Sequence, residues 1–237
     1  MIQDTDIGAI HTKELSNRMF REVLLKNGFI KEVTKGWFIA ANPSEKEGET
    51  TSWYSAYWEF CSKFLEYKYG TDWCISADHS LAIHAGNWSV PQQLIVRSSY
   101  GNNRPISFLH NTSLFNRKAD LPSSDQIIIE KGIRMYNLQS SLVYCSTAVF
   151  DKSSLDARTA LSLIRDASEI LPILLENGHS TIEGRLVGAF RNIQRDRIAD
   201  QLLDTMRQVG YDIREDDPFK NKLDVNLSLR ERSPFVR

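Results

Sequence analysis

The chain has 237 residues, of which 41% are hydrophobic and 25% charged, and its formal net charge is -1. This composition is sufficient for a sizeable core and excludes a polycationic protein, so any contact with nucleic acid must come from a local basic patch. No apolar run reaches the ~18 residues of a transmembrane helix, the acidic N-terminus does not resemble a signal peptide, and three separated cysteines without a CxxC pair favour the cytoplasm.

Residues 1–46 are predicted to form a small basic unit. Ser16 is a suitable N-cap for a helix, and Gly28 is placed to end it. The predicted elements are a short helix at residues 11–15, a second helix at residues 17–27, and a hairpin at residues 29–40 with its turn at residues 34–36. Two helices followed by a hairpin form the plan of a winged helix-turn-helix, whose second helix can enter the DNA major groove.

The second of these helices is predicted to separate an apolar from a basic face. We expect Phe20, Val23 and Leu24 to point into the core. The polar and basic side chains on the opposite face remain exposed. Those at the start of the helix are suited to contact base edges, and those on the hairpin are suited to contact phosphates. The predicted DNA-binding residues are Asn17, Arg18, Arg21, Lys31 and Lys35. The alternative is a winged helix that docks a protein and no longer binds DNA.

Residues 47–152 are predicted to form an α+β domain with a mixed sheet. Helices are expected at residues 50–69 and 77–84, the second capped by Ser76. The predicted strands lie at residues 73–75, 93–97, 106–109, 113–115, 126–130, 133–136 and 142–145. Aromatic residues on the first helix, Trp53, Tyr54 and Trp58, are interpreted as core, with a docking surface for a partner protein as the alternative.

Residues 153–215 are predicted to form a helical C-terminal layer, and residues 216–237 a tail or linker. Glu183 lies three residues after Ser180, which predicts a capping box at the start of a helix. The alternative is a faint similarity of residues 179–185 to the inhibitory motif of Fic proteins, although His179 stands where that motif has Ser or Thr.

The segment Lys26–Phe38, with its glycine, apolar pair, basic turn and aromatic strand, resembles that of AbiEi-type antitoxins. Residues 73–86 and 91–96 resemble the second domain of the same family. The chain is also similar to the N-terminal, non-catalytic region of a group of Fic-family proteins. Corresponding segments occur in the same order in both, at residues 37–38, 53–54, 81–88, 113–115 and 184–191 of this chain. This resemblance extends over about residues 15–219.

The resemblance implies a DNA-binding transcriptional regulator, an autoregulatory antitoxin-like module with operator DNA as its partner. The alternative is a protein-interaction module for a cognate toxin or Fic-domain protein, or the non-catalytic half of a Fic protein. We expect no enzyme activity, because none of the five histidines is followed by the Gly-Asn-Gly-Arg phosphate loop of Fic enzymes. We expect no cofactor and no metal: His79 and His84 are five residues apart and point in different directions on a helix.

Overall fold

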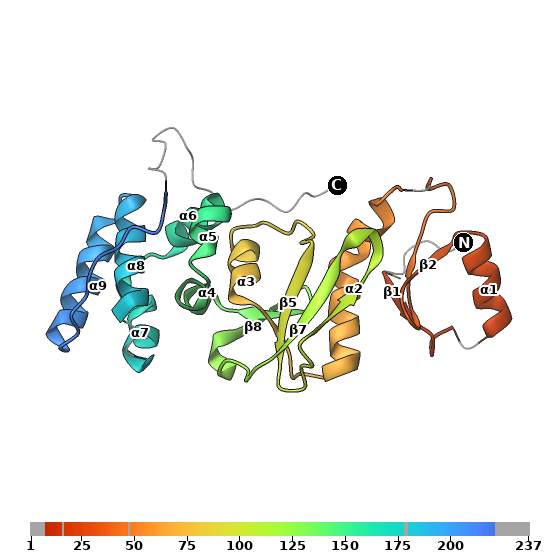
Figure 1. Cartoon of the computed structure of the whole chain (residues 1–237), viewed down its shortest axis with the longest axis horizontal. Helices are drawn as coiled ribbons and strands as arrows, with labels where there is room; N and C mark the ends of the chain where they lie inside the picture. Colours follow the sequence, from red (N-terminus) through yellow and green to blue (C-terminus); the bar gives the residue numbers. More distant parts are fainter. Residues whose placement is uncertain (1–7, 16, 47, 178–179, 221–237) are drawn as a thin grey trace. The chain divides into compact units, whose positions relative to one another are not determined.

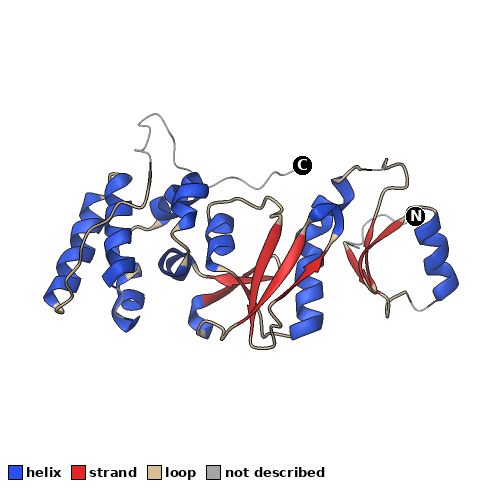
Figure 2. Ribbon diagram, in the orientation of Figure 1, coloured by secondary structure: helices blue, strands red, loops and turns tan. Residues whose placement is uncertain are grey.

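The fold of the chain is α+β, as predicted (Figures 1 and 2). The computed structural model describes residues 8–15, 17–46, 48–177 and 180–220. It divides into two compact units, and the chain passes between them several times. The first consists of Met1–Ile75, Ser89–Leu121 and Ile129–Arg134, and the second of Ser76–Trp88, Pro122–Ile128 and Met135–Arg237. This division differs from the boundaries predicted at residues 46 and 152.

The first unit begins with a three-stranded antiparallel sheet and one helix (Figure 1). Its elements are β1 (Ala9–His11), α1 (Arg18–Lys26), β2 (Ile30–Thr34) and β3 (Trp37–Ala40), and the strand order is β1-β3-β2. The predicted hairpin is confirmed. The predicted helix at residues 11–15 is wrong, because His11 pairs with Trp37 in the sheet and residues 12–14 form a turn. Backbone pairing with a distant strand outweighs the weak helix propensity of so short a segment.

A long helix, α2 (Thr51–Tyr69), forms the core of the first unit. Trp37 packs edge-on against Phe60 and Phe64 of α2, and Trp53 packs against Phe108 in the loop before β7. The helix therefore supports the small sheet and also a second, four-stranded sheet. That sheet comprises β4 (Cys74–Ile75), β5 (Gln93–Ser98), β6 (Arg104–Ser107) and β7 (Ser113–Lys118).

The four-stranded sheet has the order β4-β5-β7-β6 and is mixed, as predicted (Figure 2). β5 and β7 are parallel, while β4 and β6 run antiparallel to their neighbours. β6 is an edge strand, and Pro105 within it suits a position where one row of backbone groups has no strand partner. A separate two-stranded sheet contains β8 (Ile127–Glu130) and β9 (Ile133–Tyr136).

Helices form most of the second unit. They are α3 (Ala77–His84), α4 (Leu138–Tyr144), α5 (Ala148–Lys152), α6 (Ser154–Leu163), α7 (Leu171–Asn177), α8 (Ser180–Asn192) and α9 (Asp196–Gln208). Ser76 caps α3 by accepting a hydrogen bond from the His79 amide, as predicted. The strand predicted at residues 142–145 is wrong, because residues up to Tyr144 continue α4. The signal for this helix is Asn137, whose side chain accepts a hydrogen bond from the Ser140 amide (2.8 Å).

The segment after α9 packs against α8. The Asp216 amide donates to the Gly184 carbonyl oxygen (3.1 Å), and Ile213 and Phe219 are buried. The predicted tail from residue 216 is therefore wrong as far as Lys220, and residues 221–237 lie outside the described residues. Among the helices of the described ranges, none has the length and apolar character needed to span a bilayer.

Candidate nucleic-acid interface

The helix α1 is the element predicted to meet DNA, and it has a defined start and end. The Asn17 side chain accepts a hydrogen bond from the Phe20 amide (3.2 Å), which satisfies one of the free N–H groups of the first turn. Asn17, and not Ser16, is the N-cap; Ser16 lies outside the described residues. Lys26 in the last turn interacts favourably with the negative end of the helix dipole.

Arg18 lies at the exposed N-terminal end of α1, as predicted. Its side chain is 82% exposed, and its Nε lies 2.7 Å from a carboxylate oxygen of Glu22 one turn later. The hydrogen bond that Arg18 donates to the Glu22 carboxylate raises the pKa of Arg18, so the guanidinium stays charged. A surface pair of this kind contributes little to stability, and phosphate can displace Glu22 at small cost.

The apolar face of α1 differs from the prediction. Phe20 and Val23 are both 55% exposed, so the expectation that they point inward is wrong. Leu24 and Leu25 pack against the core formed by Ile10, Ile30 and Phe38. The helix is rotated relative to the predicted orientation, because the closely spaced apolar residues at positions 19–25 allow more than one inward face.

This rotation also changes the position of Arg21. Arg21 is half-buried, and its guanidinium carbon lies 5.9 Å from the centre of the Phe38 ring. The predicted outward orientation of Arg21 is therefore only partly correct. Its aliphatic part covers the core while the charge stays near the surface, in a cation–π arrangement with Phe38.

The two lysines of the hairpin have different surroundings. The Lys31 Nζ lies 2.6 Å from a carboxylate oxygen of Glu45, and the hydrogen bond from Lys31 lowers the pKa of Glu45 to about 2. Lys31 is thus held in an ion pair and is a poor candidate for phosphate. Lys35 is exposed at the turn between β2 and β3. The Glu32 carboxylate accepts a hydrogen bond from the Gly36 amide (3.1 Å), which fixes this turn.

The aromatic residues considered for partner binding are divided between core and surface. Trp53 is fully buried, and its Nε1 donates to the Thr112 Oγ1 (3.1 Å), so its interpretation as core is confirmed. Trp58 is half-buried and packs edge-on against Tyr57. Tyr54 is 48% exposed and is the one of the three that a partner protein could reach directly.

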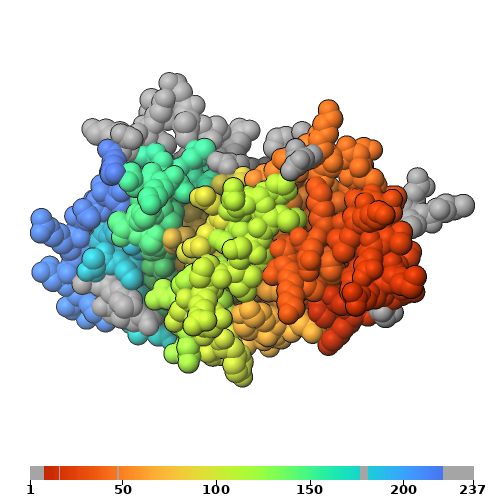
Figure 3. Space-filling model, turned by 45° about the vertical axis from the view of Figure 1, so that its right-hand side comes forward, coloured from red at the N-terminus to blue at the C-terminus, as the bar shows by residue number. Residues whose placement is uncertain are grey.

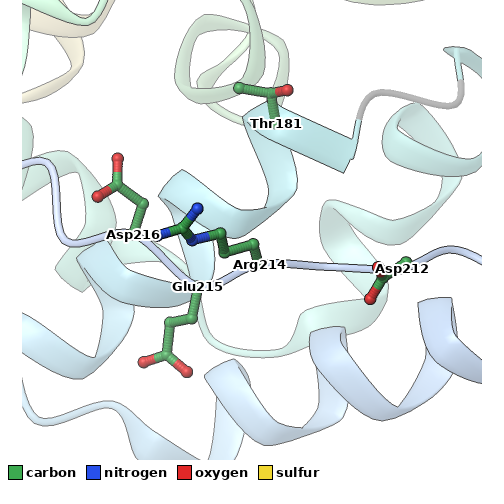
Figure 4. Close-up of a pocket in the computed structure, with 5 residues that line it drawn as sticks. All are labelled: Thr181, Asp212, Arg214, Glu215 and Asp216. Carbon is green, nitrogen blue, oxygen red and sulfur yellow. The ribbon is translucent and has the colours of Figure 1, made fainter.

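A polar pocket of about 430 Å³ lies in the second unit (Figure 4). Thr181 of α8 lines it together with Asp212, Arg214, Glu215 and Asp216 from the segment after α9. The carboxylate of Glu215 is already paired with Arg191 (2.7 Å). Across the residues that the structure describes, no three His, Cys, Asp or Glu side chains are grouped closely enough to hold a metal ion.

Comparison with known proteins identifies a solved structure with a similar fold but does not assign the chain to a family. No protein-family model matches the chain, and no curated protein sequence is significantly similar to it. Among solved structures, the chain is similar to the crystal structure of the RV2827C protein from Mycobacterium tuberculosis, with a TM-score of 0.53 and 11% identity. The match covers 83% of this chain and 75% of the other. At this identity the similarity shows the fold alone.

Proposed function

We propose that the chain is a DNA-binding transcriptional regulator and that β1 to β3 form its winged helix. The main support is the strand order β1-β3-β2, with α1 placed directly before the β2–β3 hairpin. In a winged helix the helix before the hairpin enters the major groove and the hairpin contacts phosphate. The first helix of the predicted helix-turn-helix, at residues 11–15, is replaced by a turn in the structure, and residues 1–7 are outside the described residues.

The exposed charges of this unit support two kinds of contact. Arg18 and Asn17 lie at the start of α1, where a side chain can reach base edges in the major groove. Lys35 projects from the hairpin turn, where it would bind phosphate without reading sequence. The exposed Met19 and Val23 can contact thymine methyl groups from the same helix. The resemblance to AbiEi-type antitoxins makes the DNA upstream of the chain's own gene the first target to test.

The DNA-binding proposal predicts a salt-sensitive complex that depends on Arg18 and Lys35. We expect the double variant Arg18→Glu/Lys35→Glu to lose about tenfold or more in affinity for the upstream duplex, because one base contact and one phosphate contact are each replaced by repulsion. Gel shift or fluorescence anisotropy at two salt concentrations measures this loss. The slope of log K against log salt should also become shallower by about 0.9 for each phosphate contact removed.

A matched control is Lys46→Glu, which reverses an exposed lysine in the loop between β3 and α2. This variant should bind like the wild type. If the double variant retains full affinity while circular dichroism shows it folded, the assignment of α1 and the hairpin to DNA is refuted. Arg21 is not used in this test, because reversing a half-buried charge above Phe38 would also destabilise the fold.

A second candidate function is supported by the apolar surface of α1. Met19 is 77% exposed and lies one turn before Val23, with Phe20 beside it. Such a helix face is suited to the apolar side of a partner protein, such as a cognate toxin. Under this alternative, Met19→Asp/Val23→Asp should abolish a complex with the product of a neighbouring gene in size-exclusion chromatography, while Arg18→Glu should leave that complex intact.

A further inference from the structure

A second basic surface lies on the four-stranded sheet, far along the sequence from α1. The strands β5, β6 and β7 contain four basic residues and no acidic one. Parallel β5 and β7 end at Ser98 and Lys118, and antiparallel β6 begins at Arg104, which is opposite Asn116. The register therefore places Arg104, Arg117 and Lys118 at one end of the sheet. We call these three residues, together with Tyr100 in the preceding loop, the basic sheet end.

The three cations of the basic sheet end are available for a ligand. All three are exposed, and none of them forms an ion pair with any residue in the described part of the chain. The segment from β6 to β7 lies at the surface in the space-filling view (Figure 3, yellow-green). The remaining basic residue of these strands, Arg97, is different: it is half-buried and donates to the carbonyl oxygen of Asp120 (2.7 Å).

The loop between β5 and β6 carries an exposed aromatic residue and packs against this end of the sheet. Tyr100 is 75% exposed, so most of its ring is accessible to a ligand. Gly101 allows the loop to lie directly on β7: a Cβ atom at this position would be 2.5 Å from the Lys118 backbone nitrogen. The Asn103 Oδ1 also accepts a hydrogen bond from the Lys118 amide (2.8 Å), which ties the loop to the strand.

The base of the same loop is held by a carboxylate. The Asp72 Oδ2 accepts hydrogen bonds from the Ser99 amide (2.9 Å), the Ser99 hydroxyl (2.6 Å) and the Ser98 hydroxyl (2.9 Å). Burial acts to raise the pKa of Asp72, but these hydrogen bonds outweigh it and lower the pKa. Asp72 is therefore committed to holding the loop. A loop already fixed in this way loses little conformational entropy when Tyr100 contacts a ligand.

We propose that the basic sheet end binds single-stranded nucleic acid. A strand that passes over this end of the sheet would bring its phosphates to Arg104 and Lys118, which lie on one face, and to Arg117, which lies on the other. The Tyr100 ring would stack on an unpaired base. Exposed cations and an exposed aromatic ring on a fixed loop are the two features that sequence-tolerant single-strand binding combines. An acidic peptide would satisfy the charges but gives no role to the exposed ring. The surface is separate from α1, so this proposal does not depend on the function proposed for the winged helix.

The test uses the full chain and a fluorescein-labelled oligothymidine of about twelve nucleotides, in the size range of single-strand sites. Fluorescence anisotropy at low salt should show binding, with a slope of log K against log salt of about -2 for three phosphate contacts. Arg104→Glu/Arg117→Glu/Lys118→Glu should lose tenfold or more in affinity. Tyr100→Ala should lose about tenfold, and Tyr100→Phe should bind like the wild type because it keeps the ring.

Two control variants test whether binding depends on the basic sheet end itself or only on the total charge and number of exposed aromatic residues of the protein. Arg207→Glu reverses an exposed arginine on α9, and Tyr54→Ala removes an exposed tyrosine on α2; both should bind the oligothymidine like the wild type. Wild-type affinity in the triple variant or in Tyr100→Ala would overturn the proposal. So would equal competition by an unlabelled duplex. Arg18→Glu/Lys35→Glu should leave oligothymidine binding unchanged, so that failure of the winged-helix proposal and failure of this one give different results.

Discussion

Relative to the wild type, Glu183→Gln is expected to gain about 3 kcal/mol of stability as the pH rises from 4.5 to 7, and to keep that gain at higher pH. Glu183 is fully buried in α8, and neither carboxylate oxygen accepts a hydrogen bond from any of the described residues. Burial raises the pKa of Glu183 from 4.5 to about 7. An ionised carboxylate in this position has no compensating partner, so the folded state resists ionisation. A neutral amide of similar shape avoids that cost.

The pH dependence gives the sign of the effect. Between pH 4.5 and pH 7 the folded state holds a proton on Glu183 that the unfolded state has released, so wild-type stability falls as pH rises through this range. The Gln variant has no such group. The difference in stability between variant and wild type should therefore grow from about pH 4.5 to pH 7 and then remain constant. Its final size is set by the pKa shift of Glu183, at about 1.4 kcal/mol for each unit of pKa.

Urea unfolding followed by circular dichroism at a series of pH values measures this difference. Glu130→Gln, which changes an exposed carboxylate on β8, is the control and should show no such pH-dependent gain. Parallel pH profiles for Glu183→Gln and wild type would show that Glu183 is ionised and solvated in the folded state. Because neither Glu183 oxygen accepts a hydrogen bond from the described residues, Glu183 does not take the part that the predicted capping box gives it; the side chain of Ser180 is outside the described residues.

Gly184→Ala is expected to release the segment after α9 from the surface of α8. A Cβ atom at Gly184 would lie 2.0 Å from the Arg214 carbonyl oxygen, and one at Gly188 would lie 2.2 Å from the Asp216 carbonyl oxygen. Both obstacles are backbone atoms, which cannot rotate away as a side chain can. The variant should lose the burial of Ile213, the residue next to Arg214, a cost on the order of 2 kcal/mol.

A loss of stability in Gly184→Ala would be informative, because helix propensity alone predicts that this substitution stabilises α8. Alanine inside a helix is favoured over glycine by about 0.5–1 kcal/mol. Hydrogen exchange should show faster exchange at the Asp216 amide, which donates to the Gly184 carbonyl oxygen. Gln201→Ala, at an exposed position of α9, is the control for a change confined to the helix surface. A gain in stability for Gly184→Ala, with the Asp216 amide still protected, would contradict the proposed packing.

Local sequence signals determined much of the secondary structure. Apolar periodicity and glycine ends identified α2 and α9, and Ser76 identified the start of α3. These signals depend on residues that are close together in the sequence, within one or two helical turns. They can therefore be recognised without knowledge of the tertiary structure. The hairpin of β2 and β3 belongs to the same class, because Gly36 adopts a positive φ of 79° at its turn.

Tertiary contacts decided the features on which the candidate sites depend. The apolar residues of α1 permit several inward faces, and only packing of Leu24 and Leu25 on Phe38 selects the face that exposes Met19 and half-buries Arg21. Pairing of Lys31 with Glu45 likewise brings together residues on separate segments.

The basic sheet end was not predicted from the sequence, although strands without acidic residues were a visible signal. Its three cations are up to 14 positions apart along the chain, and only the pairing of β6 with β7 brings them to one end of the sheet. The burial of Glu183 likewise depends on contacts between segments that are distant in the sequence. Local propensity determines which segments become helices and strands, whereas strand register and helix rotation are set by non-local packing, which has no short-range pattern.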